Sequence, residues 1–528
     1  MKKNNLHAKS LFTALVLGVA SIGLATAGTI AFFQNNATVL ATVTSAIIDV
    51  KVKAVATSFT KTPTTSTATM TIHSDGSVLL SNVAPNDTLT FELAITNNST
   101  IPAYYHITHT CDLAGMTVTT GADSDTLLSA KTNPSNVTVT VKYSGTETET
   151  KNATITFGVE TVQANLRKEA ADGTAFISAM NSGAKKVVLT QDVTAAFSTT
   201  ASTYNGEHDA IQVRKEQILD LGGKTLTVTN TDNFITFIVT RKGGSLTIRN
   251  GKIIYSRLDA STSTKGTTYC ALSAIEGSTL TLDNVTYTAT DATCFYFDGG
   301  SHVVIKNNST VETTNGDYVF ATKTNENTSV IDIEGSTLKV DSTDKNIGVG
   351  LQLFGGSTVN MKDSKLYFKR SAITARGANI HLSGTNHLYK TGNATNTDSK
   401  NGTFGDDYAV PESYLYVGND TNTKYPYDSS LTLDGTVNFD TSVVPGTAIT
   451  DNTPIVLAAN DSNNMTFTPN GHYSGVVSVF DFRTGTTADS NFKIQGNDIA
   501  TATTKRKHDG NLKVTIGSDN SVTWSGAD

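Results

Sequence analysis

The sequence is poor in cysteine, tryptophan, proline and charged residues, and each shortage excludes a class of protein. It has three Cys, one Trp and nine Pro among 528 residues, and charged residues make up 16%. So few cysteines, in an odd number, do not form the disulfide framework of a small secreted scaffold. The net charge is −7, and no basic block exists beyond Lys505–Lys507. No nucleic-acid partner is therefore expected.

Motifs that identify several enzyme classes are also missing. The sequence has no His-Glu-x-x-His, no Gly-rich phosphate loop that opens a helix, no Cys-x-x-Cys and no Gly-x-Ser-x-Gly. The only close pair of histidines is His106 and His109, in a predicted strand. Because strand residues three apart point to opposite faces, these two cannot bind one metal ion as a local pair. No metal site and no resident cofactor is predicted.

What the sequence does contain is a short phrase that recurs between Gly222 and Phe439. Each copy has an apolar residue, any residue, a second apolar residue, any residue, and then Asn, Gly or Asp. Alternating apolar residues bury one face of a short strand, and Asn, Gly and Asp tolerate a left-handed backbone. We expect the last residues of the copies to form a turn ladder along one edge: Asn230, Asn250, Asn284, Asn307, Gly335, Asp363, Gly384 and Gly435.

Two further short strands accompany the phrase. Leu338–Val340 and Leu366–Phe368 follow a copy, and Cys294–Gly300 precedes the next one. Three short strands per repeat, with repeats in the twenties of residues, predict a solenoid built from stacked coils. A single coil cannot bury its own apolar face, so stability must come from stacking. The pattern resembles the right-handed parallel β-helix superfamily, which includes pectate lyases, polygalacturonases and many surface adhesins.

Two cysteines lie about one coil apart. Cys270 is seven residues before Gly277, whereas Cys294 is six residues before Gly300. An offset of one residue places side chains on opposite faces of a strand. We therefore expect free, buried thiols at both positions.

The first 31 residues have the pattern of an export signal. Basic residues near the start precede an apolar core from Leu11 to Ala27, which is typical of a secretory signal peptide. The alternative is a membrane anchor, because the apolar run extends to Phe33. Cleavage after Ala31 is expected, which would leave a protein without stable membrane insertion that is secreted to the cell surface or an extracellular matrix.

Residues 32–165 carry a second resemblance. The segments that resemble the TasA/camelysin family are Gly28–Phe33, Ala46–Val52, Ser77–Leu89, Phe91–Asn98 and Thr154–Gln163. The resemblance implies a jelly-roll-like β-sandwich, cleavage by an ER-type signal peptidase and formation of biofilm-matrix fibres. Some members are labelled metallopeptidases, but the motif for that activity is missing here. Short alternating strands with turn residues between them favour the same sandwich.

The β pattern is interrupted between the two predicted domains. Leu166–Ala171 has helix-forming composition, Asp172 precedes an apolar stretch, and Gly183 follows it. We expect a short amphipathic helix that covers the first coil of a β-helix spanning 166–450. Residues 451–528 retain shorter β segments that cap or extend it. The predicted fold class is thus all-β: a β-sandwich, then a right-handed parallel β-helix with a short N-terminal capping helix.

Polysaccharide lyases and hydrolases of the β-helix fold supply an alternative function. Lyases hold calcium with clustered carboxylates and use an Arg or Lys as base, whereas hydrolases use paired Asp residues. Calcium is expected as a cofactor only in the lyase case. The candidate residues are Asp406, Asp407, Lys369, Arg370, Arg376, Asp317 and Asp344.

The favoured prediction is a secreted, non-enzymatic surface or biofilm-matrix protein that acts as an adhesive or structural rod. Extracellular glycans or other surface proteins are its expected partners. Once freed by cleavage, Phe32–Val52 is expected to join the next subunit's sheet as an added strand. A second alternative is a carbohydrate-binding module. Its candidate contacts, which otherwise pack the long loop onto the helix, are Tyr408, Tyr414, Tyr416, Tyr425 and Tyr427.

Overall fold

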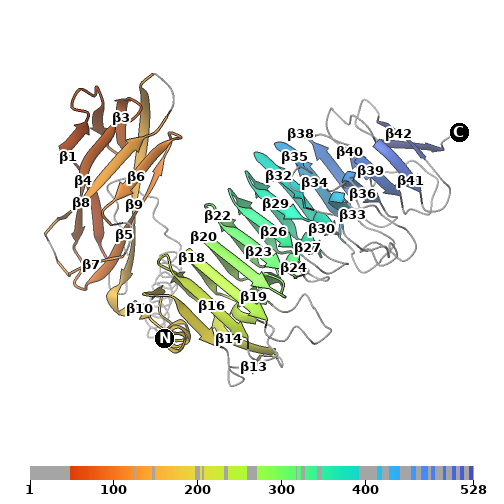
Figure 1. Ribbon diagram of the computed structural model, residues 1–528, viewed down its shortest axis with the longest axis horizontal. Helices are drawn as coiled ribbons and strands as arrows, with labels where there is room; N and C mark the ends of the chain where they lie inside the picture. Colours follow the sequence, from red (N-terminus) through yellow and green to blue (C-terminus); the bar gives the residue numbers. More distant parts are fainter. Residues whose placement is uncertain are drawn as a thin grey trace, which may run out of the picture. The chain divides into compact units, whose positions relative to one another are not determined.

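The computed structural model describes most of the chain after residue 47 (Figure 1). The described segments are 48–122, 125–131, 133–145, 149–196, 203–204, 207–230, 236–257, 270–316, 318–322, 328–341, 348–391, 413–418, 427–440, 453–459, 465–473, 477–481, 492–494, 502–506, 512–516 and 522–526. The chain divides into two compact units, Met1–Arg167 and Lys168–Asp528. None of the helices that these segments form has the length and hydropathy required to cross a membrane.

The first unit is a sandwich of two antiparallel sheets. One sheet has the order β1-β4-β8-β6 and the other β2-β3-β9-β5-β7. Alternate residues of β4 are fully buried, and Phe91 on that strand meets Phe157 on β9 edge-on, with 5.9 Å between ring centroids. Residues from the two inner faces therefore share one core. The strands are β1 (Val50–Thr62), β2 (Thr69–Ile72), β3 (Val78–Val83), β4 (Thr88–Asn97), β5 (Ala103–Cys111), β6 (Met116–Thr120), β7 (Thr126–Leu128), β8 (Ser135–Tyr143) and β9 (Lys151–Gln163).

The N-terminal strand of the sandwich is paired within its own chain. Val50 and Val52 on β1 lie opposite Asn97 and Ile95 on β4, and both valines are buried. The C-terminal end of the Phe32–Val52 segment is therefore paired within its own chain in this structure. Burying the two valines completes this sheet's own apolar face. Residues 32–47, and the predicted cleavage site at Ala31, lie outside the described residues.

The second unit is a parallel β-helix with three rows of strands, named rows A, B and C here (Figure 1). Row A contains β11 (Lys186–Leu189), β15 (Glu216–Asp220), the first parts of β18 (Ser245–Arg257) and β20 (Thr279–Thr290), β22 (His302–Lys306), β25 (Val330–Glu334), β28 (Thr358–Lys362), β31 (Asn379–Ser383), β34 (Ser429–Leu433), β37 (Met465–Pro469) and β40 (Phe492–Ile494).

Rows B and C complete each coil. Row B contains β12 (Val193–Ala196), β16 (Thr225–Asn230), the second parts of β18 and β20, β23 (Thr310–Thr314), β26 (Thr337–Asp341), β29 (Lys365–Phe368), β32 (Thr385–Lys390), β35 (Thr436–Asp440) and β38 (His472–Tyr473). Row C contains β14 (Glu207–Val213), β17 (Thr236–Thr240), β19 (Cys270–Ala274), β21 (Phe295–Phe297), β24 (Tyr318–Thr322), β27 (Val349–Phe354), β30 (Ser371–Arg376), β33 (Ser413–Gly418), β36 (Thr453–Ala459), β39 (Val477–Asp481) and β41 (Ala502–Arg506).

Neighbouring coils pair in register, so like positions stack along the β-helix. In row A, Leu246 lies opposite Leu280, which lies opposite Val303, which lies opposite Ile331. All four are buried in one continuous core. The predicted all-β class, with a parallel β-helix after a sandwich, is confirmed. Beyond the rows, β13 (Thr203–Tyr204) pairs antiparallel with β14, and β42 (Leu512–Ile516) and β43 (Val522–Gly526) form a hairpin.

The bend from row A to row B is made by left-handed residues. Asn250, Asn284, Asn307 and Asp363 have φ of 57°, 56°, 56° and 49°, and Gly335 and Gly384 have φ of 56° and 64°. Asn and Gly adopt this conformation at little cost. The side chains do not form one continuous amide ladder, however. Asn284 donates to Asn250 over 3.3 Å, whereas Asn307 donates to Asp283 over 2.7 Å.

One member of the predicted turn ladder, Asn230, was assigned wrongly. Asn230 ends a row B strand and lies opposite Arg257, because Leu226 pairs with Ile253. The row A strand of that coil is β15. A two-residue period describes any half-buried strand, so it does not distinguish rows. Gly435 lies beside Gly384 on the predicted edge, but it lacks positive φ. A Cβ at Gly435 would collide with the backbone of Gly384, so only glycine fits where these two coils approach each other closely.

A short helix covers the first coil, as predicted. Helix α2 spans Gly173–Asn181, and the Asp172 side chain caps it by accepting from the Ala175 amide over 2.8 Å. Phe176 is fully buried and stacks on Phe237 at 6.2 Å. The helix-forming composition of Leu166–Ala171 was misleading. This segment holds the end of a 3₁₀ turn, η1 (Ala164–Leu166), and strand β10 (Arg167–Ala170), which joins the sheet beside β11.

All three cysteines are free thiols, and Cys270 and Cys294 are fully buried. Leu272 lies opposite Phe295, so the two cysteines are one residue out of register, as their spacing predicted. Burial raises the pKa of the Cys294 thiol well above its usual value. A neutral, enclosed thiol of this kind is structural.

Candidate functional site

Several almost fully buried polar groups of the β-helix point outward from row C. Both faces of β30 and β33 are buried, whereas strands in rows A and B alternate between buried and partly exposed residues. Register pairing stacks one outward residue from each coil into a column, which we call the row C column. Its members are Gln212, Val239, Ser273, Tyr296, Ala321, Gln352, Thr374, Tyr416 and Val456.

Three adjacent members of the row C column are polar and almost fully buried. Gln352 is 2% exposed, and Thr374 and Tyr416 are 0% exposed. The Gln352 amide and the Thr374 hydroxyl have no hydrogen-bond partner among the described residues. Arg376, at the end of β30, is 6% exposed and lies opposite Phe354. This part of the column thus offers donors and acceptors beside a guanidinium group.

The described row C column contains no carboxylate. A retaining glycosidase places two carboxyl groups about 5 Å apart, and an inverting one places them about 6.5–9.5 Å apart. An amide, a hydroxyl and a phenol bind by hydrogen bonding but cannot replace that pair as acid and nucleophile. Within the described segments there is also no group of three or more His, Cys, Asp or Glu side chains able to hold a metal ion.

Replacing Gln352 by methionine is expected to stabilise the protein by about 1 kcal/mol. The substitution keeps the side chain's shape and removes an amide that is buried without a partner among the described residues. Urea unfolding followed by circular dichroism measures the effect, with Thr374→Val as a second test of the same column. A loss of more than about 1 kcal/mol would contradict this description of the column.

The three predicted cationic candidates have different surroundings. Arg376 lies beside the row C column, two residues after Thr374 on β30. Arg370 is half-buried just before β30, where its backbone N–H donates to the Gly348 carbonyl over 3.0 Å. Lys369 forms an ion pair with Asp341 at 2.7 Å, which links adjacent row B strands. Candidates that lie outside the described residues are Asp317, Asp344, Asp406, Asp407, Tyr408 and Tyr425.

Tyr414 does not contact solvent, so its assignment as a glycan contact was wrong. It lies on β33, and its ring packs edge-on against Phe368 at 4.9 Å and against Phe439 at 5.1 Å. Burial raises the pKa of Tyr414. Tyr416, next but one on the same strand, is also fully buried, in the row C column. Both lie in a strand where the sequence suggested a loop, because the long loop ends earlier than expected.

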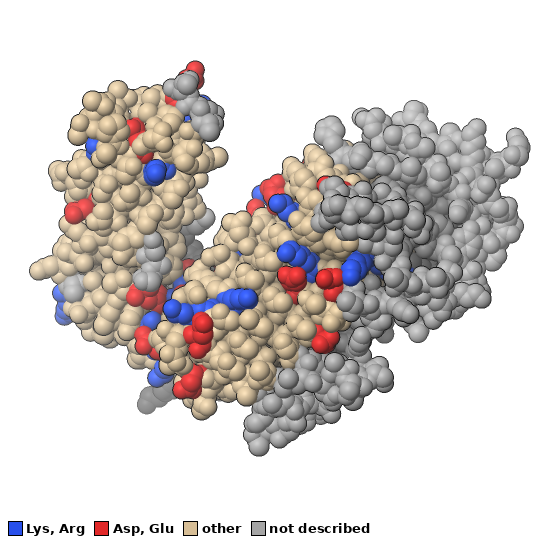
Figure 2. Space-filling model, viewed as in Figure 1, with Lys and Arg blue, Asp and Glu red and all other residues tan. Residues whose placement is uncertain are grey.

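The outer face of row A carries charges of alternating sign. Successive coils present Asp220, Arg249, Asp283, Lys306, Glu334 and Lys362 at the fourth position of the phrase. These form ion pairs at 3.0 Å (Arg249–Asp220), 3.4 Å (Lys306–Asp283) and 2.8 Å (Lys362–Glu334). Figure 2 shows blue and red side chains next to each other on this unit. In-register strands lie about 4.8 Å apart, so like charges would repel and alternation favours stacking.

Histidines extend this pattern of pairing between coils. The His302 ring lies 2.7 Å from the Asp332 carboxylate, and the His381 ring lies 2.7 Å from Asp434. Asn360 also donates to Asp332, over 2.7 Å. Sequence reasoning missed these partners because it examined each copy of the phrase separately. The signal becomes visible when the outward-facing residues of successive coils are compared.

No protein-family model matches the sequence, and no curated protein matches it. Among solved structures, the chain is similar to PfbA, a surface adhesin of Streptococcus pneumoniae, with 11% identity and a TM-score of 0.33 over 67% of this chain and 97% of that chain. It is also similar to the catalytic unit of a thermostable GH87 alpha-1,3-glucanase from Streptomyces thermodiastaticus, with 11% identity and a TM-score of 0.29 over 87% of this chain and 98% of that chain. Structural similarity at such low sequence identity and TM-score does not distinguish an adhesin from a glycosidase.

Proposed function

We propose that this protein is a secreted, non-enzymatic rod of a cell surface or biofilm matrix, and that its β-helix contacts extracellular glycans. The observation that carries this proposal is the pairing of charged side chains between coils. Asp220, Asp283, Asp332, Glu334 and Asp434 each lie within 3.4 Å of a cationic or histidine side chain of another coil. Carboxylates paired in this way stabilise the stacking of neighbouring coils, and an extended rod depends on that stacking.

The N-terminal sandwich is proposed to attach or polymerise the rod, as in the TasA/camelysin family that its sequence resembles. Export through residues 1–31 and cleavage after Ala31 would leave residues 32–49 ahead of β1. Strand β1 is at the end of its sheet's strand order, and such an edge accepts an added strand from another chain. Deleting residues 32–45 is expected to abolish fibres seen by electron microscopy, and fibres that persist would contradict this part of the proposal.

The glycan proposal is tested by incubating the full chain with acidic and neutral polysaccharides in the presence of calcium. The protein is expected to sediment with at least one polymer, while absorbance from unsaturated products and the number of reducing ends stay at background. A rise in either product signal would overturn the non-enzymatic assignment in favour of a lyase or a hydrolase. No co-sedimentation with any polymer would overturn the glycan contact itself.

A further inference from the structure

Row B presents large aromatic side chains on its outer face at two adjacent coils. Register pairing stacks one outward residue per coil into a column along this row. Its members are Thr194, Thr227, Ile254, Thr288, Glu312, Lys339, Tyr367, Tyr389 and Asp440. Threonine suits a solvated strand face, and it occupies three of these nine positions. The two tyrosines instead present large rings at β29 and β32, and His387 is beside them on β32.

These three side chains form what we call the aromatic strip. The rings of Tyr367 and Tyr389 stack with centroids 4.6 Å apart and planes at 17°, and the His387 ring is parallel to Tyr389 at 5.7 Å and 7°. All three are partly exposed. Stacking of the two tyrosine rings stabilises the contact between their coils. This stabilising role does not explain why His387 is there, because its ring forms no hydrogen bond or ion pair with the described residues.

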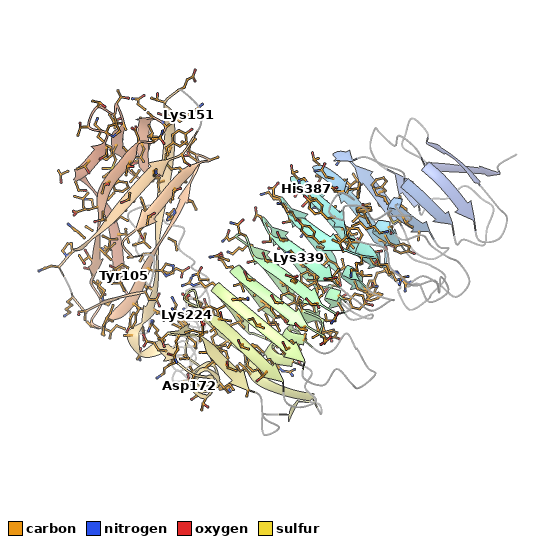
Figure 3. The ribbon with its side chains drawn as sticks, viewed as in Figure 1. Tyr105, Lys151, Asp172, Lys224, Lys339 and His387 are labelled. Carbon is orange, nitrogen blue, oxygen red and sulfur yellow. The ribbon has the colours of Figure 1, made fainter. Side chains whose placement is uncertain are left out.

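An uncompensated cation lies next to the aromatic strip. Lys365 is exposed on β29, directly opposite His387. Neighbouring lysines have carboxylate partners: Lys339 pairs with Glu312 at 3.9 Å, and Lys362 pairs with Glu334 at 2.8 Å. No carboxylate of the described segments lies within ion-pair distance of Lys365. Figure 3 labels Lys339 and His387, which come from strands near one another along the β-helix.

We propose that the aromatic strip, together with Lys365, is the glycan contact of this rod and that it takes an anionic polysaccharide. This inference rests on the proposed function. Tyrosine and histidine rings offer an apolar surface to the C–H faces of sugar rings, and their polar atoms hydrogen-bond to sugar hydroxyls. Lys365 supplies a positive charge, free of a carboxylate partner, for a carboxylate or sulfate group on the polymer. Bound polymer would lie along neighbouring coils, over β29 and β32.

The test compares binding of the full chain to polygalacturonate, dextran sulfate and neutral dextran by co-sedimentation. The substitutions His387→Ala and Lys365→Gln are expected to weaken binding to the anionic polymer about tenfold each. Neither side chain forms an ion pair or hydrogen bond that holds coils together within the described segments. Lys362→Gln is the matched control, because this outward lysine of the same coil is already paired with Glu334. It is expected to change binding less than about twofold.

The outcomes separate this inference from the proposal on which it rests. If the unmodified protein binds none of the polymers, the proposed glycan contact fails. If it binds but His387→Ala and Lys365→Gln bind equally well, the aromatic strip is overturned and the proposed function stands. Equal binding to neutral dextran overturns the anionic class. Preference for polygalacturonate or for dextran sulfate identifies the anionic group as a carboxylate or a sulfate.

Discussion

Replacing Phe320 by alanine is expected to lower the free energy of unfolding by about 3–5 kcal/mol. Phe320 is fully buried on β24, with its ring centroid 5.2 Å from Phe295 and 5.4 Å from Phe297, both on the preceding coil's row C strand. Removing the ring leaves a cavity between two coils and breaks the aromatic cluster that joins them. Urea unfolding followed by circular dichroism measures the loss.

The matched control for this substitution is Val304→Ala. Val304 is on the outer face of row A and only half-buried, so its replacement is expected to cost about 1 kcal/mol or less. If both substitutions had the same small effect, the core between coils would not provide the stability of the β-helix.

Replacing Asp220 by asparagine is the second substitution with a large expected effect, a loss of about 3–5 kcal/mol. The Asp220 carboxylate lies 3.0 Å from the Arg249 guanidinium and 3.2 Å from the Lys186 ammonium. The three side chains are 14%, 9% and 4% exposed, so the substitution removes a largely buried carboxylate that pairs with two largely buried cations. Glu334→Gln is the control, since that carboxylate and Lys362 are 61% and 53% exposed and such pairs contribute about 0–1 kcal/mol.

The same cluster predicts a dependence of stability on pH. Burial raises the pKa of Asp220, but Arg249 and Lys186 outweigh burial, so the pKa is lower than its usual value. A carboxyl group whose pKa is lowered by folding contributes stability above its unfolded pKa of about 3.9. That contribution is lost as the pH falls through the lower, folded value. Urea midpoints between pH 6 and pH 2 are expected to fall less steeply for Asp220→Asn than for the unmodified chain. If the urea midpoints of both proteins fell equally steeply with pH, the Asp220 carboxylate would not be the source of this pH dependence.

The β-helix was predictable because its signals are local. An inward-facing pair of apolar residues and a following residue with positive φ, as at Asn250 and Asn284, bend each coil in the same way. Local sequence signals do not show to which row a strand belongs. The Leu226–Asn230 copy fits the phrase and still belongs to row B, because pairing with β18 fixes its place. Leu166–Ala171 was misjudged for a related reason, since a sheet edge overrides helix propensity.

The candidate site was less predictable than the fold. Tyr414 was expected on a loop surface, yet Phe368 and Phe439 from other strands enclose it. Tyr367 and Tyr389 were not selected from the sequence, because their contact depends on the register between strands of successive coils. On the outer face of a β-helix, a binding surface is formed by residues of several coils that stack in one column. Such a column can be identified only when the register between the coils is known.

In-register stacking of the coils underlies both the paired charges and the aromatic strip, and engineered cysteines test it most directly. Thr281 lies opposite Val304 on the next coil, with Cα atoms about 4.8 Å apart, whereas Lys306 is two residues further along that strand. Thr281→Cys with Val304→Cys is expected to form a disulfide, detected by mass spectrometry of linked peptides. Thr281→Cys with Lys306→Cys is expected not to form one, because that Cα separation of roughly 8 Å exceeds disulfide reach. Linking of the second pair in preference to the first would contradict in-register stacking.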